Sequence, residues 1–243
     1  MFGGGISPRP YYPEQVRGFG PEFIDAYELG VKSTLLDGRL DLNVALFYND
    51  YQDYQAGIQE CVDEAGNILP PELAVPCGQY GNVADADVQG AELEFQAYLL
   101  DDMQIIGAVS YIDFEFGEPF IETNSVIAGA EAPGIGDVQA SLSWQHGFEL
   151  GAAGRLTPRL DAVYTPGYCG NLECSELARN ESYTLVNGRL TYENPDATWR
   201  VALEVRNLTD ELYATNVVVT PIGYASHQVA PGRQWNLFVR HSF

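Results

Sequence analysis

Positively charged residues are scarce in this sequence: 12 Lys and Arg stand against 34 Asp and Glu in 243 residues, and the formal net charge is −22. No Lys or Arg occurs between Arg39 and Arg155. A protein that binds nucleic acid needs a basic surface to replace the counterions of the phosphates. The composition therefore argues against nucleic acid as a partner.

Long hydrophobic runs are also missing. No apolar stretch approaches the roughly 18 residues of a transmembrane helix. The first residues, Met1 to Pro8, lack the basic start and the apolar stretch of a signal peptide, so an exported protein with this sequence is expected to have lost its beginning. Intrinsic disorder is not expected, because 46% of the residues are hydrophobic and 12% are aromatic.

Catalytic motifs are not evident either. The three histidines, His146, His227 and His241, are far apart, and only His227 lies in a segment that could meet a solute. Nothing resembles a nucleophile with its base or a glycine-rich phosphate loop. The sequence predicts that the protein is not an enzyme.

The sequence does contain segments in which apolar and polar residues alternate, which is the pattern of a β-strand with two different faces. In the clearest segment, 39–54, one face would carry Leu40, Leu42, Val44, Leu46 and Tyr48, and the other Asp41, Asn43, Ala45 and Asn49. The same alternation predicts further strands at 92–99, 138–145, 183–192, 199–206 and 232–243. Weaker patterns lie at 27–34, 104–116 and 151–164, for a total of about nine strands.

The connections between these strands alternate in length. Short turns are expected at 36–38, 100–102, 146–147 and 193–196, and long segments near 57–87, 117–135, 165–181 and 209–231. This order is typical of an antiparallel up-and-down barrel in an outer membrane, which has tight periplasmic turns and large extracellular loops. The polar faces would then line a wet lumen and the apolar faces would meet lipid.

Aromatic residues cluster near the expected strand ends. In a membrane barrel they would form the girdles at the two interfaces, although aromatic residues favour any strand. The residues concerned are Tyr48, Tyr51, Trp144, Tyr164, Tyr192, Trp199, Trp235 and Phe243.

The last expected strand carries a pattern of its own. Trp235, Leu237, Val239 and Phe243 share one face and polar residues the other. A soluble domain rarely ends on an unprotected strand, because a free edge invites pairing with other chains, and barrel closure removes that edge. This ending resembles the C-terminal signal of outer-membrane barrels, except that His241 stands where an apolar residue is usual.

Several motifs resemble the C-terminal half of a TonB-dependent outer-membrane receptor. They are Ala26 to Ser33, Asp37 to Gln55, Gly81 to Ala84 followed by Val88 to Glu94, Val205 to Tyr213 with its Asn207-Leu-Thr-Asp210, and Pro231-Gly-Arg233. They span almost the whole chain in the order that the family has.

The resemblance implies a receptor of the Gram-negative outer membrane, with about 22 strands around a plugged lumen. Such a receptor takes up a scarce nutrient, for example an iron-siderophore complex, with energy from the TonB complex. Residues 1–243 would be the C-terminal part of the barrel, without the plug domain, the N-terminal strands or the segment that contacts TonB, and would not transport alone. The alternatives are a small autonomous porin or adhesin-like barrel and a soluble β-sandwich that binds glycans.

Four cysteines lie in two pairs inside the expected extracellular loops. Local disulfides between Cys61 and Cys77 and between Cys169 and Cys174 are the simplest interpretation in an oxidising compartment. Zinc is less suitable, because there is no Cys-x-x-Cys and no nearby histidine. Other pairings of the four cysteines remain possible.

The expected loops suggest how a ligand would be met. Candidate ligand-facing residues are Tyr80, Glu118, Tyr168 and His227. The long segments 57–87 and 117–135 hold acids and no bases, which favours a neutral or cationic cargo, or a metal chelate without a large negative charge. No resident cofactor is expected, although calcium could bind among the acidic groups, which are Asp63 and Glu64, Asp85 and Asp87, and Asp113, Glu115 and Glu118.

Overall fold

The computed structural model describes most of the chain as β-strand. The described residues are 3–6, 16, 18–58, 62–63, 65, 67–70, 79–120, 128–129, 133–172, 174–219 and 224–243. Within these ranges, no helix has the length and apolar character needed to cross a membrane. The only described helices are two single-turn 3-10 helices, η2 (Gly151–Ala153) and η3 (Glu176–Ala178).

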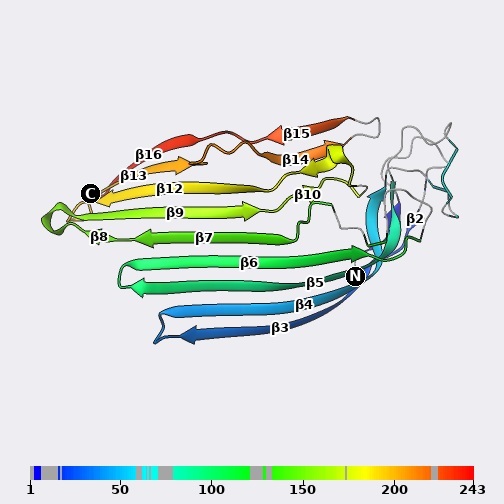
Figure 1. Ribbon diagram of the computed structural model, residues 1–243, viewed down its shortest axis with the longest axis horizontal. Helices are drawn as coiled ribbons and strands as arrows, with labels where there is room; N and C mark the ends of the chain where they lie inside the picture. The colour runs from blue at the N-terminus through cyan, green and yellow to red at the C-terminus, as the bar shows by residue number, and fades with distance from the viewer. Residues whose placement is uncertain are drawn as a thin grey trace.

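One ten-stranded antiparallel sheet dominates the molecule (Figure 1). Its strands are β3 (Phe23–Leu35), β4 (Leu40–Ile58), β5 (Gln79–Leu100), β6 (Met103–Phe116), β7 (Val138–His146), β8 (Phe148–Glu149), β9 (Arg155–Thr165), β12 (Tyr183–Glu193), β13 (Trp199–Arg206) and β16 (Gln234–His241). Each long strand pairs with the next one along the chain, and the two-residue β8 pairs with β9. The sequence predicted about nine strands in an up-and-down topology, and the long strands of this sheet confirm that prediction.

Three small hairpins lie outside the main sheet. They are β1 (Gly5–Ile6) with β2 (Gly18–Phe19), β10 (Tyr168–Cys169) with β11 (Arg179–Asn180), and β14 (Ala214–Val219) with β15 (Ala225–Val229). The sequence pattern did not predict them. Several boundaries were also wrong: β3 begins at Phe23 and not at residue 27, and β4 continues to Ile58 and not only to residue 54. β5 begins at Gln79 and not near residue 92, and β9 begins at Arg155 because η2 occupies residues 151–153.

The sheet is open and its two ends differ. β3 and β16 are its edge strands and do not pair with each other. The short turns gather at one end, on the left of Figure 1, and the long connections at the other, so we call these the short-turn end and the long-loop end. The predicted alternation of connection lengths is confirmed.

The two faces of the sheet differ in polarity, as the alternation predicted. Cross-strand register aligns Val44 with Val31 and Leu93 on the outer face, and likewise Leu203 with Leu190 and Leu237. These apolar side chains are exposed in the isolated chain; Leu142 in the middle of β7, for example, is 51% exposed. An exposed apolar surface of this extent suits lipid.

Most of the aromatic residues assigned to girdles lie on the outer face. They are Tyr48, Trp144, Tyr164, Tyr192, Trp199 and Trp235, by their register with outward-facing neighbours. Tyr51 was assigned wrongly: it pairs with Ala86 on the inner face, and its ring meets that of Tyr54 edge-on at 5.6 Å. His241 lies on the outer face between the rings of Trp199 and Phe243, at 4.3 and 4.6 Å, so it acts there as a third ring.

The segment after β13 is fixed by the side chain of Asn207. Its Oδ1 accepts a hydrogen bond from the Glu211 amide at 2.8 Å, its Nδ2 donates to the Glu211 carbonyl at 2.8 Å, and its own amide donates to Asn187 Oδ1 at 2.9 Å. Asp210 then accepts the amide of Arg233 at 2.8 Å, immediately before β16. The Asn207 to Asp210 and Pro231 to Arg233 motifs therefore contact each other and set where the last strand begins.

We expect Asn207→Ala to destabilise the folded chain by about 2 to 3 kcal/mol. The substitution leaves partly buried backbone groups of Glu211 without their side-chain partners, and it places alanine at a φ of +52°, which suits asparagine and glycine. Urea unfolding in lipid vesicles would measure the loss. Asn207→Gly is the matched control, because it removes the same hydrogen bonds but tolerates the backbone; it should be less damaging than alanine, and the reverse order would contradict this explanation.

Candidate functional site

The inner wall, which is the polar face of the main sheet, is divided by charge. On β3 to β5 its charged residues are Glu28, Lys32, Asp41, Glu92 and Glu94. On β9, β12, β13 and β16 they are Arg155, Arg159, Asp161, Arg189, Glu193, Arg200, Glu204, Arg206 and Arg240. The scarce cations of this acidic chain are thus concentrated on the inner wall near its C-terminal edge.

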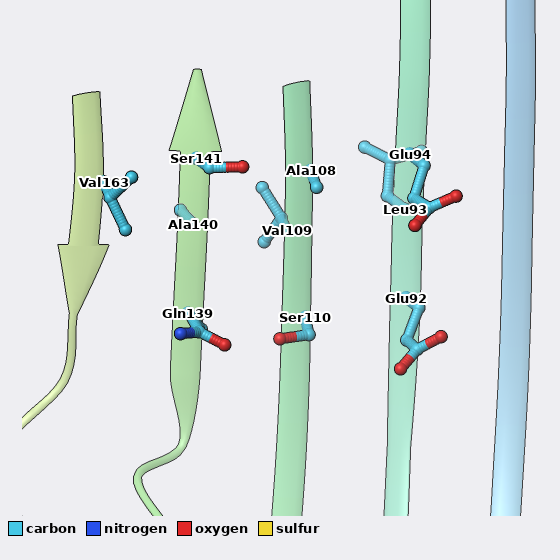
Figure 2. Close-up of a pocket in the computed structure, with 10 residues that line it drawn as sticks. All are labelled: Glu92, Leu93, Glu94, Ala108, Val109, Ser110, Gln139, Ala140, Ser141 and Val163. Carbon is cyan, nitrogen blue, oxygen red and sulfur yellow. The ribbon is translucent and has the colours of Figure 1, made fainter. Parts of the chain in front are cut away.

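A depression lies on the acidic side of the inner wall (Figure 2). It forms where Ala108 and Ser110 of β6 and Ser141 of β7 present small side chains beside Glu92 and Glu94 of β5. Within the described part of the chain, neither glutamate has an ion-pair partner. The depression therefore offers two uncompensated carboxylates to whatever occupies the lumen.

On the basic side, the charges are held in pairs. Asp161 accepts hydrogen bonds from Arg159 at 2.7 Å and from the hydroxyl of Ser143 at 2.6 Å. Glu204 lies between Arg189, at 3.3 Å, and Arg206, at 2.8 Å. These contacts partly neutralise this side of the wall and fix its side chains.

At the long-loop end, the inner wall carries an aromatic cluster. Phe114 and Phe116 of β6 meet edge-on at 4.9 Å, and Tyr54 of β4 meets both, at 5.7 and 5.3 Å. Loop residues pack against this cluster, among them Val62 and Leu172. Because the cluster joins neighbouring hairpins, it fixes how the long connections leave the sheet.

The four candidate ligand-facing residues fall into two groups. Tyr80 is half exposed on β5, and exposed Glu118 follows β6, which lies beside β5. Tyr168 of β10 donates from its hydroxyl to the carbonyl of Thr215 at 3.5 Å, and His227 of β15 pairs with Val217 of the same hairpin. The structure thus places Tyr80 and Glu118 on neighbouring parts of the sheet, and Tyr168 against the hairpin that carries His227. Contact with a ligand remains a prediction for all four.

One of the two expected disulfides lies among the described residues. Cys169 and Cys174 are joined, with their Cα atoms 5.0 Å apart. Cys61 and Cys77 lie outside the described residues.

Calcium binding remains a prediction. Among the described residues there is no group of three or more Asp, Glu, His or Cys side chains arranged to hold a metal ion. Asp85 instead accepts the amide of Asp53 at 3.0 Å, and Asp113 accepts the side-chain amide of Gln89 at 2.9 Å. Glu64 lies outside the described residues.

A row of acidic residues on the outer face was not evident from the sequence. Asp25, Asp50, Asp87 and Glu115 oppose one another directly across β3, β4, β5 and β6. The row lies just beyond the stacked rings of Tyr27 and Tyr48, toward the long-loop end. Because carboxylates do not enter hydrocarbon, the row marks where the lipid-facing surface ends.

These features define the wall of an outer-membrane β-barrel: an antiparallel sheet, one face compatible with lipid, one charged face, and an alternation of short and long connections. The family described as TonB dependent receptor-like, beta-barrel matches residues 1–208. The chain belongs to this family. Its place is therefore the Gram-negative outer membrane, where the short turns are periplasmic and the long loops extracellular.

Individual proteins that resemble this chain are receptors of the same kind. The chain is 29% identical over 145 residues to the metal-pseudopaline receptor CntO of Pseudomonas aeruginosa, covering 56% of this chain and 18% of the receptor. The ferric yersiniabactin uptake receptor FyuA of Yersinia pestis superposes with a TM-score of 0.77 at 20% identity, over 99% of this chain and 33% of FyuA. The siderophore receptor PiuA of Acinetobacter baumannii gives 0.68 at 24% identity, over 92% and 29%. The chain thus spans a third or less of each of these receptors.

Proposed function

We propose that this chain forms the C-terminal part of the barrel wall of a receptor that takes up a scarce nutrient, such as an iron-siderophore complex or another metal chelate. The open sheet carries this proposal, because a sheet with a lipid face, a lumen face and two free edges needs further strands to close. In the proposed receptor, the remaining strands complete a barrel of about 22, a plug fills the lumen, and the TonB complex supplies energy through the N-terminal region.

The kind of ligand is supported by the relatives and by charge. CntO and FyuA are receptors for metal-pseudopaline and ferric yersiniabactin, both metal chelates. At the long-loop end of this chain, the described acids include Asp63, Glu118, Glu176 and Glu181. Arg179 is a positive charge at the same end, and it has no ion-pair partner among the described residues. These acids thus outnumber this cation. Acidic loops repel anions, so the proposed cargo is a chelate that is neutral or cationic.

The alternatives receive less support. A small autonomous barrel requires β3 to pair with β16, and the sheet order keeps them at opposite edges. A soluble glycan-binding sandwich would need a second layer over the apolar outer face. We also propose that the receptor moves its ligand without chemical change, and so is not an enzyme.

Uptake measurements test the function. We expect deletion of the gene to abolish growth on, and uptake of, one radiolabelled ferric chelate supplied as the sole iron source, and a tonB deletion to have the same effect. Restoring the gene should restore uptake. Uptake that persists without TonB would favour a porin-like barrel, and a preference for a polyanionic chelate would contradict the proposed ligand charge.

A further inference from the structure

The disulfide loop between Cys169 and Cys174 lies over the lumen side of the sheet. Leu172, inside this loop, is only 7% exposed and belongs to the cluster that contains Phe114 and Phe116 of β6. The loop follows β9, and β7 separates β9 from β6. Phe114 and Phe116 extend beyond the start of β7, whose first residue Val138 pairs with Tyr111, so the loop reaches them past the segment before β7, where Ile135 packs against the same cluster.

The same loop contacts two other extracellular connections. The amide of Gly134, in the β6–β7 connection, donates to the carbonyl of Cys169 at 2.7 Å. Val217 of β14 is 3% exposed and packs so closely on Gly170 that a side chain at Gly170 would overlap it. Asn180 of β11 adds a hydrogen bond to the carbonyl of Ala214 at 3.1 Å. Described residues of three connections therefore meet at this disulfide loop: 133–137 before β7, 166–172 with 174–182 after β9, and 207–219 after β13.

We propose that the disulfide loop is a latch that joins these three connections into one lid, anchored by Leu172 on the inner wall. The ring closed by the disulfide limits the conformations of the short segment that carries Leu172, so anchoring it costs less entropy than it would in an open chain. The proposal deepens the proposed function, on which it rests, because a lid at the extracellular end controls how a ligand enters the lumen. The described residues of the three connections then move as one body.

Hydrogen exchange of the whole receptor in detergent micelles tests the latch. Replacing both cysteines with serine (C169S/C174S) should accelerate exchange at least tenfold in segments that contain Gly134, Gly170 and β14, while the main sheet keeps its protection. Acceleration confined to residues 169–174 would overturn the proposal.

A second variant keeps the disulfide and removes the anchor. Leu172→Ala should accelerate exchange in the same three connections, whereas Leu177→Ala, which changes a side chain that is 53% exposed in the same connection, should not. Equal effects of the two variants would overturn the proposal, even if the double serine variant failed to fold. Neither readout requires a ligand, so a failed uptake experiment with an intact latch would count against the proposed function alone.

Discussion

Replacing Leu142 with arginine should prevent most of the receptor from assembling in the membrane. Leu142 lies at the centre of β7 on the outer face, opposite Gly107 and Ala162, so no acidic neighbour faces it from either strand. An arginine near the bilayer midplane of a barrel costs about 2 to 4 kcal/mol. The folded fraction can be measured by resistance to protease and by urea unfolding in vesicles.

The matched control is the preceding residue. Ser141→Arg places the same charge on the same strand, but on the inner wall beside Ala108 and near the carboxylate of Glu94. We expect this variant to assemble at close to the normal level. If the two variants assembled equally well, or if Ser141→Arg were the worse one, the assignment of the two faces would be wrong.

The parts of the fold that depend on residue alternation could be predicted from the sequence. Alternation places Leu46 and Asn43 on opposite faces of β4 whatever the partner strand is, and a hairpin topology follows when each strand pairs with the next. The alternation of short and long connections then fixed which strand ends lie together. These features need no knowledge of distant contacts.

The features that depend on tertiary contacts could not be predicted. β4 continues beyond Tyr54 through a bulge at which Asp53 has a φ of +58°, and the amide of Gln55 is held by Glu22, more than thirty residues away. The β14–β15 hairpin was missed because 217–219 is an uninterrupted apolar run, in which Val217 is buried against Gly170 although the exposed Val218 beside it is equally apolar. The acidic row across β3 to β6 requires cross-strand register, which the sequence of any one strand does not contain.

The candidate site also has some features that could be predicted from the sequence and others that could not. Glu92 and Glu94 were assigned to the polar face, but their isolation from any described cation follows from small neighbours on β6 and β7. The Cys169–Cys174 disulfide was predicted from spacing. Its contact with two other connections was not, because those contacts join residues far apart in sequence.

Two glycines of the sheet interior should respond very differently to substitution. Gly90 of β5 opposes Phe47 of β4, and Gly107 of β6 opposes Phe95 of β5, so each glycine is covered by an aromatic ring. A Cβ at Gly107 would overlap only the ring of Phe95, on the lipid side, where the ring can turn away. A Cβ at Gly90 would overlap the Phe47 ring and also the backbone carbonyl of Tyr111, which cannot move without disturbing the pairing of β5 with β6.

We therefore expect Gly90→Ala to lower the free energy of unfolding by about 1 to 3 kcal/mol, and Gly107→Ala to lower it by less. Double variants distinguish the causes. Adding Phe95→Ala should remove the clash at Gly107, whereas adding Phe47→Ala should not rescue Gly90→Ala, because the carbonyl of Tyr111 remains in place. Urea unfolding of the four variants in vesicles would distinguish these two causes. Rescue of Gly90→Ala by Phe47→Ala would contradict the explanation, because it would show that overlap with the ring, and not the close approach of two strands, makes glycine necessary there.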